Sequence, residues 1–144
     1  YVQEFVDKPG RDIRVLAVDG EPIAAMVRSS DHWLTNAAKG AETDTFELDD
    51  RALELVEQAS AAVGGGLLGI DLMEVGVSRS DTQNASGEQS DPRAREFEDY
   101  TVHEVNHTVE FKALNEITDV DVPSEVVDWL ESKAQSPSDG ETTA

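Results

Sequence analysis

The chain contains no cysteine, so a disulfide framework and a thiolate metal site are both excluded. Basic residues are scarce, because 11 Lys and Arg stand against 31 Asp and Glu, for a formal net charge of -20. Such a charge argues against non-specific binding to nucleic acid or to an anionic membrane. No apolar stretch reaches the ~20 residues of a transmembrane helix, and no signal peptide is visible. We therefore expect a cytoplasmic protein with neither nucleic acid nor membrane among its partners.

The acidity itself has two physical interpretations. One is a disordered acidic protein. The other is a folded, halophilic protein with an acid-coated surface, in which dense salt screens the self-repulsion. A hydrophobic content of 38% and regularly spaced apolar runs favour the folded interpretation, and 144 residues suffice for one domain with a core.

The spacing of apolar and turn residues predicts an α+β fold, an antiparallel β-sheet backed by helices. Asp19-Gly20 is a hairpin signal, and Gly64 to Gly66 end a helix that Asp49 or Asp50 caps. The expected strands are 1–6, 12–18, 23–28, 45–48, 67–75 and 100–106, and the expected helices are 50–63, 111–116 and 123–134. We expect one domain over 1–134 with a flexible insertion at 78–98, followed by a disordered tail at 135–144.

Two of the helices carry apolar stripes that predict which face packs on the sheet. The first stripe consists of Leu53, Val56 and Ala59 or Ser60. The second consists of Val126, Val127 and Leu130.

The most informative residues are acids on strands that are otherwise apolar. Asp71 lies in the run 69–74, while Glu104 and Asn106 share one face of the run 103–108, since strand side chains alternate. If these strands pair, two carboxylates and an amide oxygen converge, which is the oxygen-rich ligand set that suits Mg²⁺ and phosphates. The alternative is that these are polar residues at strand ends, satisfied by backbone groups.

Two arginines also lie on predicted strands, at Arg14 and Arg28. Arginine is a natural clamp for phosphate or carboxylate, but these residues could equally be partners for a very acidic surface. His107 and Thr108 directly follow the predicted metal strand, and their residue types fit a structural role as well as a functional one. Gly64 to Gly66 lack the Lys-Ser/Thr that follows a phosphate-binding loop, so we interpret them as a helix stop.

Four strings in this order resemble the ATP-grasp ligases, and within them the amino-group-carrier-protein ligases of the LysX/ArgX type, relatives of the RimK glutamate ligases. The strings are YVQEFVDKPGRDIRVLAV, IAAMVRSSDHWLTNAAKG, AAVGGGLLGIDLMEV and VHEVNHTVEFKALNEITDVDVP. E-V-N-H-T-V-E-F is the most specific of them, and His107-Thr108 favours the carrier-protein branch over RimK.

The resemblance implies that this chain is the C-terminal half of an ATP-grasp domain. Gln3, Glu4, Phe5 and Val6 would form the adenine-binding hinge, with backbone groups of Glu4 and Val6 contacting the base and Phe5 covering it. The other implied ATP-binding residues are Asp12, Leu34, Thr35 and Asn36. Arg28 and Asn36 would be catalytic, and Arg14, Arg28, His107 and Thr108 would bind substrate. Asp71, Glu104 and Asn106 would hold Mg²⁺, with Glu104 bridging two ions.

The implied reaction has two steps. A carboxylate attacks the γ-phosphate of ATP to give an acylphosphate, and an amine then displaces phosphate to leave an amide. In the carrier-protein branch the carboxylate belongs to the C-terminal Glu of a small acidic LysW-type carrier, and the amine is that of glutamate or α-aminoadipate, in arginine or lysine biosynthesis. The alternatives are a RimK-like glutamate ligase with another acceptor, and a non-catalytic metal-binding module. Relatives also imply a homo-oligomer.

Two features concern the extent of the chain. It opens on Tyr1 within a β-rich run, so we expect a piece of a longer protein. In the family the preceding part supplies lysines that hold the ATP phosphates, so this segment alone is expected to be inactive. The insertion at 78–98 is longer than the family's usual hairpin at that point.

Overall fold

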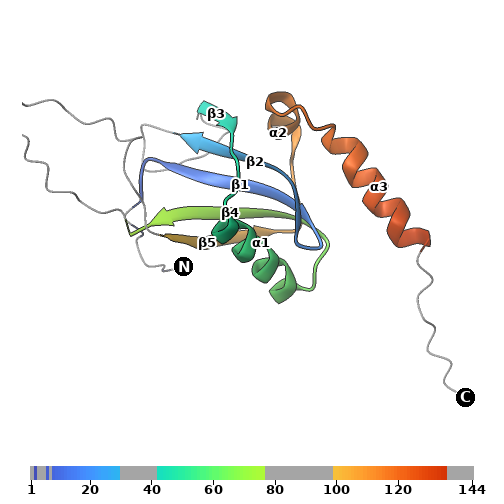
Figure 1. Ribbon diagram of the computed structural model, residues 1–144, viewed down its shortest axis with the longest axis horizontal. Coiled ribbons are helices and arrows are strands. Elements are labelled where there is room, and N and C mark those ends of the chain that lie inside the picture. The colour runs from blue at the N-terminus through green and yellow to red at the C-terminus, as the bar shows by residue number, and fades with distance from the viewer. Residues whose placement is uncertain (1, 3–5, 7, 30–41, 77–98, 136–144) are drawn as a thin grey trace, which may run out of the picture.

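The computed structural model describes residues 2, 6, 8–29, 42–76 and 99–135, and these carry one antiparallel sheet (Figure 1). Its five strands lie in the order β3-β2-β1-β4-β5, so β1 and β4 are neighbours although they are distant in sequence. The strands are β1 (Arg11–Val18), β2 (Glu21–Ser29), β3 (Glu42–Thr45), β4 (Leu67–Val75) and β5 (Asp99–Asn106). The α+β class and the antiparallel pairing are as predicted.

The tight hairpin between β1 and β2 is confirmed. Asp19 and Gly20 form the two-residue turn, with φ of 49° and 91°. Two consecutive positive φ angles match the twist of the flanking strands, which is why Asp-Gly occurs at such turns. The turn and an irregularity between Leu16 and Ala17 together set the register that pairs Arg14 with Met26 and Asp12 with Arg28.

One face of the sheet is covered by α1 (Asp50–Val63). Asp49 caps the helix by accepting a hydrogen bond from the Ala52 amide at 2.8 Å, and Gly64 ends it in a left-handed conformation. The predicted stripe is confirmed at Val56 and Ser60 but is wrong at Leu53, which is 38% exposed, while Ala52 is buried instead. The buried residues recur every four positions and are small, which lets the helix approach the apolar strands closely.

The opposite face carries a second apolar cluster beneath α2 (Lys112–Ile117) and α3 (Val122–Gln135). Leu16 and Met26 of the sheet pack there with Leu114 and Val126. Figure 1 shows α3 running away from the sheet. For that reason Val127 and Leu130 do not share the burial of Val126 as predicted; they are 50% and 52% exposed.

Other predicted elements differ or lie elsewhere. The short strand predicted at 45–48 is wrong by three residues, because Phe46 and Leu48 leave the ladder and pack against the core under α1. Of the strand predicted at 1–6, only Val2 and Val6 are described, and neither is in a strand. The insertion at 78–98 and the tail at 136–144 lie outside the described residues, while Gln135 is the last residue of α3. Within the described ranges, no helix is long and apolar enough to cross a membrane.

Candidate functional site

The three predicted metal ligands meet on one face of the sheet. In the β4–β5 ladder Asp71 pairs with Glu104, and Gly69 pairs with Asn106. Paired residues, and residues two apart on a strand, point to the same face, so both carboxylates and the amide face the α2–α3 side. A bulge after Asp71 sets this register, because Leu72 then pairs with Val102 and leaves His103 as the extra residue. The predicted strand pairing is confirmed.

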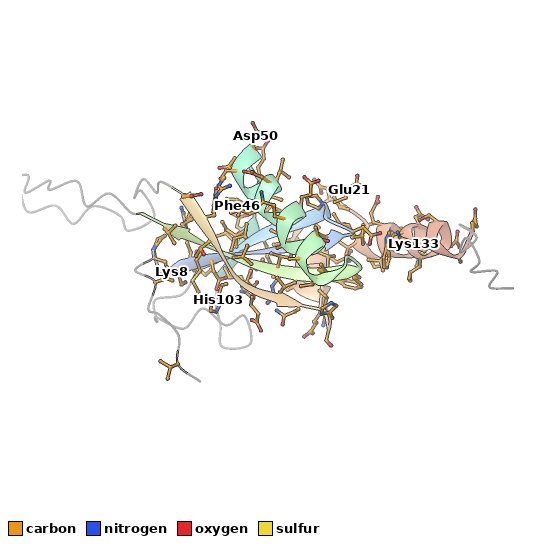
Figure 2. All side chains as sticks on the ribbon, turned by 90° about the horizontal axis from the view of Figure 1, so that it is seen from below. Lys8, Glu21, Phe46, Asp50, His103 and Lys133 are labelled. Atoms are coloured by element: carbon orange, nitrogen blue, oxygen red, sulfur yellow. The ribbon has the colours of Figure 1, made fainter. Side chains whose placement is uncertain are left out.

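Burial differs sharply between the two carboxylates. Asp71 is 3% exposed, whereas Glu104 lies in the exposed part of β5 and Asn106 is half-buried at its end. Figure 2 shows this strand from below, with His103 of β5 and Asp50 of α1 on opposite sides of the sheet. One carboxylate is therefore fixed within the sheet, and the other is accessible to solvent and ligands.

Two arginines converge on the buried carboxylate. The Nη2 of Arg14 lies 2.7 Å from Oδ2 of Asp71 while its Nε contacts Oδ1, which gives a two-pronged ion pair across the β1–β4 ladder. The Nη2 of Arg28, from β2, reaches the same Oδ1 at 3.2 Å. Arg28 also donates through Nε to Oδ1 of Asp12 at 2.7 Å. The partners of both arginines are thus buried strand acids, not surface acids.

These four side chains form a line of alternating charge, Asp12–Arg28–Asp71–Arg14, which we call the charge line. Burial lowers the pKa of the Arg28 guanidinium, but its hydrogen bond with Asp12 and the charges of Asp71 and Asp12 outweigh burial, so its pKa is raised. Arg28 therefore stays a cation, as a phosphate or carboxylate ligand requires. Removing one member of such a buried set leaves a charge without its partner.

Lys8 lies beside the Asp12 end of the charge line and binds the backbone, with Nζ 2.8 Å from the Arg11 carbonyl oxygen. Burial lowers the pKa of this ammonium group, and the charge of Asp12 only partly offsets that effect.

Gly69 makes room for the two-pronged pair. A Cβ at this position would lie 3.3 Å from Nη1 of Arg14 and 3.4 Å from Cγ1 of Val109. A glycine in the middle of an apolar strand is unfavourable in itself, but it commonly marks a close approach by another group. Here the approaching group is the guanidinium of the charge line.

The donor set fits a hard divalent cation. Asp71, Glu104 and Asn106 supply oxygen ligands only, which suits Mg²⁺ when phosphates and water complete its shell. Among the described residues no group of three His, Cys, Asp or Glu could hold a metal, so a third protein ligand beside Asp71 and Glu104 would have to be of another type, such as the amide of Asn106. The role of the three residues as ligands stays a prediction.

A second buried ion pair lies on the α1 face of the same strands. Arg11 donates through Nε and Nη2 to Glu74 at 2.5 and 2.6 Å, and Glu74 is 1% exposed. Beside it the Tyr100 hydroxyl donates to Asp49, the cap of α1, at 2.9 Å. Burial, followed by that hydrogen bond, raises the pKa of Tyr100. No role was predicted for Glu74, although an acid on an apolar strand was the available signal.

The structure describes three of the remaining predicted site residues. Val6 is half-buried outside any strand, and His107 and Thr108 are exposed directly after β5. The others lie outside the described residues: Gln3, Glu4, Phe5, Leu34, Thr35 and Asn36.

Solved structures with the same fold are ATP-grasp ligases. The structure of the ATP-grasp ligase PsnB with minimal precursor, Mg and ADP matches 92% of this chain and 35% of its own length, with a TM-score of 0.62 and 20% sequence identity. Its complex with a phosphomimetic precursor variant, Mg and ADP gives a TM-score of 0.60 at 22% identity over the same shares. The sheet and its helices therefore have the ATP-grasp fold.

The family model for the RimK-like ATP-grasp domain matches residues 1–81, more than half of the chain. The chain belongs to the RimK-like ATP-grasp family. This match contains Asp12, Arg14, Arg28 and Asp71, and so the whole charge line.

Curated relatives carry three different ligase names. Tetrahydromethanopterin:alpha-L-glutamate ligase of Methanosarcina acetivorans is 36% identical over 90 residues, 61% of this chain and 28% of the relative. The alpha-aminoadipate–LysW ligase LysX of Sulfolobus acidocaldarius is 32% identical over 130 residues, 90% and 40% respectively. The glutamate–LysW ligase ArgX of that organism is 27% identical over 133 residues, 91% and 40%. The chain thus spans between 28% and 40% of these relatives, and the resemblance to LysX and ArgX is confirmed.

Proposed function

We propose that the protein carrying this chain is an ATP-dependent carboxylate–amine ligase that joins an α-amino dicarboxylic acid to a carboxylate through an acylphosphate. One observation carries the proposal: Asp71, Glu104 and Asn106 share one face of the sheet with the cations of buried Arg28 and half-buried Arg14. Oxygen ligands and cations on one face are what phosphoryl transfer by positioning and charge neutralisation requires.

The residues of this face would have two roles, metal binding and phosphate binding. Asp71 and Glu104, with Asn106, would hold Mg²⁺, and Glu104 would be shared between two ions. The bound ions neutralise phosphate charge during transfer. Arg28, held by Asp12 at 2.7 Å, keeps a permanent positive charge next to this position and would bind the transferred phosphate.

Arg14 would bind a substrate carboxylate or phosphate from the same face. Its guanidinium has the planar fork that matches either group, and its side chain is 18% exposed. We propose that Asn36 and the hinge at Gln3, Glu4, Phe5 and Val6 complete the ATP site.

For the substrates, the carrier-protein branch is the first candidate. Coverage does not separate the branches, because LysX, ArgX and methanopterin-linked relatives match up to 90%, 91% and 89% of this chain respectively. His107-Thr108, exposed directly after β5, is the feature that favours the carrier-protein branch. The acceptor would then be the C-terminal Glu of a small acidic LysW-type carrier, and the amine would come from glutamate or α-aminoadipate.

A second candidate is transfer of glutamate to another acceptor, as in RimK-like ligases. The relatives that support it are tetrahydromethanopterin:alpha-L-glutamate ligases, one of them 36% identical over 90 residues. The third reading, a metal-binding module without chemistry, differs from both in predicting metal binding that does not depend on nucleotide.

The test is ATP consumption by the full-length protein at high salt with Mg²⁺. ADP and phosphate release that requires both a LysW-type carrier and one amino acid would support the first candidate and identify the amine. Release with glutamate and another acceptor, but with no carrier, would support the second. No ATP use with any acceptor, together with Mg²⁺ binding unchanged by ATP, would overturn the ligase proposal.

A further inference from the structure

The buried carboxylate of the proposed metal site is already occupied by guanidinium groups. Arg14 contacts both oxygens of Asp71, and Arg28 adds a third N–H at 3.2 Å. An ionised carboxylate has about four acceptor positions, so roughly three are taken in this structure. A metal ion at Asp71 therefore has to compete with protein cations for the same oxygens.

The two arginines differ in how firmly they are held. Arg28 is 8% exposed in its side chain and is anchored by Asp12 as well as by Asp71. Arg14 is 18% exposed, and its two-pronged contact is with Asp71. It also borders the opening that Gly69 leaves in the strand. Arg14 is thus the cation that can move away from Asp71 while Arg28 keeps its contacts with Asp12 and Asp71.

We propose that Arg14 is a positioning residue that occupies the place of the divalent cation. Arg14 holds the Asp71 carboxylate while no metal is bound, and it releases at least one oxygen of Asp71 when metal binds. This inference rests on the proposed metal site. Its reason is electrostatic: a divalent ion would be the third cation at a buried carboxylate that Arg14 and Arg28 already share, and like charges repel more strongly there than in water. The released guanidinium would stay on the same face of the sheet, where its fork can bind a phosphate or a carboxylate.

Competition with metal and a simple structural role of Arg14 predict opposite changes in metal affinity when Arg14 is replaced. If Arg14 competes with metal, then Arg14→Gln should strengthen metal binding in the absence of nucleotide. If Arg14 merely orients Asp71 for metal, the same substitution should weaken it. Arg11→Gln is a matched control, because Arg11 lies on the same strand and makes the same two-pronged pair, with Glu74, on the other face.

The experiment measures Mn²⁺ affinity of the full-length protein from the electron paramagnetic resonance signal of free Mn²⁺, with and without a non-hydrolysable ATP analogue. Without nucleotide, Arg14→Gln should bind Mn²⁺ about tenfold more tightly than wild type, as expected when one competing charge pair is lost. Mn²⁺ should also raise the thermal midpoint of Arg14→Gln more than that of wild type, since the ion replaces the missing cation. Arg11→Gln should leave Mn²⁺ affinity unchanged.

Should Arg14→Gln fail to fold, Arg14→Lys provides the same test. It keeps the charge but loses the fork, so it should shift Mn²⁺ affinity in the same direction by a smaller factor. Unchanged or weaker Mn²⁺ binding by the folded Arg14 variants would overturn the inference. Asp71→Asn separates this failure from failure of the proposed function. If Asp71→Asn leaves Mn²⁺ binding intact even with the ATP analogue, there is no metal site at Asp71 and both ideas fail. If the variant is folded, as its circular dichroism spectrum would show, and no longer binds Mn²⁺, the site stands whatever Arg14 does.

Discussion

Substitutions of the two carboxylates of the candidate site should both abolish activity, but only one of them should lower stability. Glu104→Gln removes an exposed charge from β5, and a surface change of this kind alters the free energy of unfolding by at most ~0.5 kcal/mol. Asp71→Asn removes a carboxylate that is 3% exposed and contacts two arginines. Breaking a buried pair costs about 3–5 kcal/mol, and we expect about 3 kcal/mol here because Arg28 retains Asp12. Both variants should lose ATP turnover, since each removes a proposed metal ligand.

The assay combines urea unfolding at fixed high salt with ADP release by the full-length protein. Glu110→Gln is the control, because it neutralises another exposed acid shortly after β5 that is outside the proposed ligand set. The expected result is normal stability and normal turnover for the control, normal stability without turnover for Glu104→Gln, and loss of both for Asp71→Asn. Normal turnover in Glu104→Gln would refute the metal assignment. A stability loss in Glu104→Gln as large as that in Asp71→Asn would refute the assignment of burial and charge.

Other predictions concern the rest of the ion pairs. Arg28→Ala should abolish turnover and lower the urea midpoint, because it removes a buried cation of the charge line. Arg51→Ala breaks only exposed ion pairs and should leave both the urea midpoint and ADP release unchanged. Glu74→Gln should lower the free energy of unfolding by about 1.5–3 kcal/mol, because it weakens the charge-assisted hydrogen bonds between buried Glu74 and half-buried Arg11 on the opposite face. It should not alter Mn²⁺ affinity; altered Mn²⁺ affinity would show that the two faces are coupled. The pKa of Asp19 is lowered from 3.8 to about 2, first by Lys133, then by the Trp129 indole and the Gly66 amide. A carboxyl group whose pKa is lower in the folded than in the unfolded protein stabilises the fold above its unfolded pKa, and this stabilisation is lost as the pH falls through its folded pKa. The contact of Asp19 with α3 should therefore loosen between about pH 4 and pH 2. The Trp129 indole N–H signal should follow this titration in NMR spectra, and the same titration in Asp19→Asn would contradict the assignment.

Local signals in the sequence were sufficient for most elements of the fold. Asp19-Gly20 predicts its hairpin because few residue pairs adopt two positive φ angles. The α1 helix begins and ends as predicted because Asp49 supplies a capping oxygen and Gly64 tolerates a left-handed conformation. Where side-chain patterns alone were used, the helix faces were partly wrong, since burial of Leu53 or Val127 depends on what lies opposite.

For the candidate site, the sequence alone determined which residue types stand out: acids and an amide on apolar strands, two strand arginines, and strings that resemble ATP-grasp ligases. It could not determine the partners of those charges. The Asp71 carboxylate meets Arg14 and Arg28, which are 57 and 43 residues away in sequence, only because β1 lies between β2 and β4. Contacts of that kind depend on strand order and register, which no local pattern encodes. The tertiary structure therefore decided that these acids and arginines form one charge line, and that Glu74 and Arg11 lie apart from it on the opposite face.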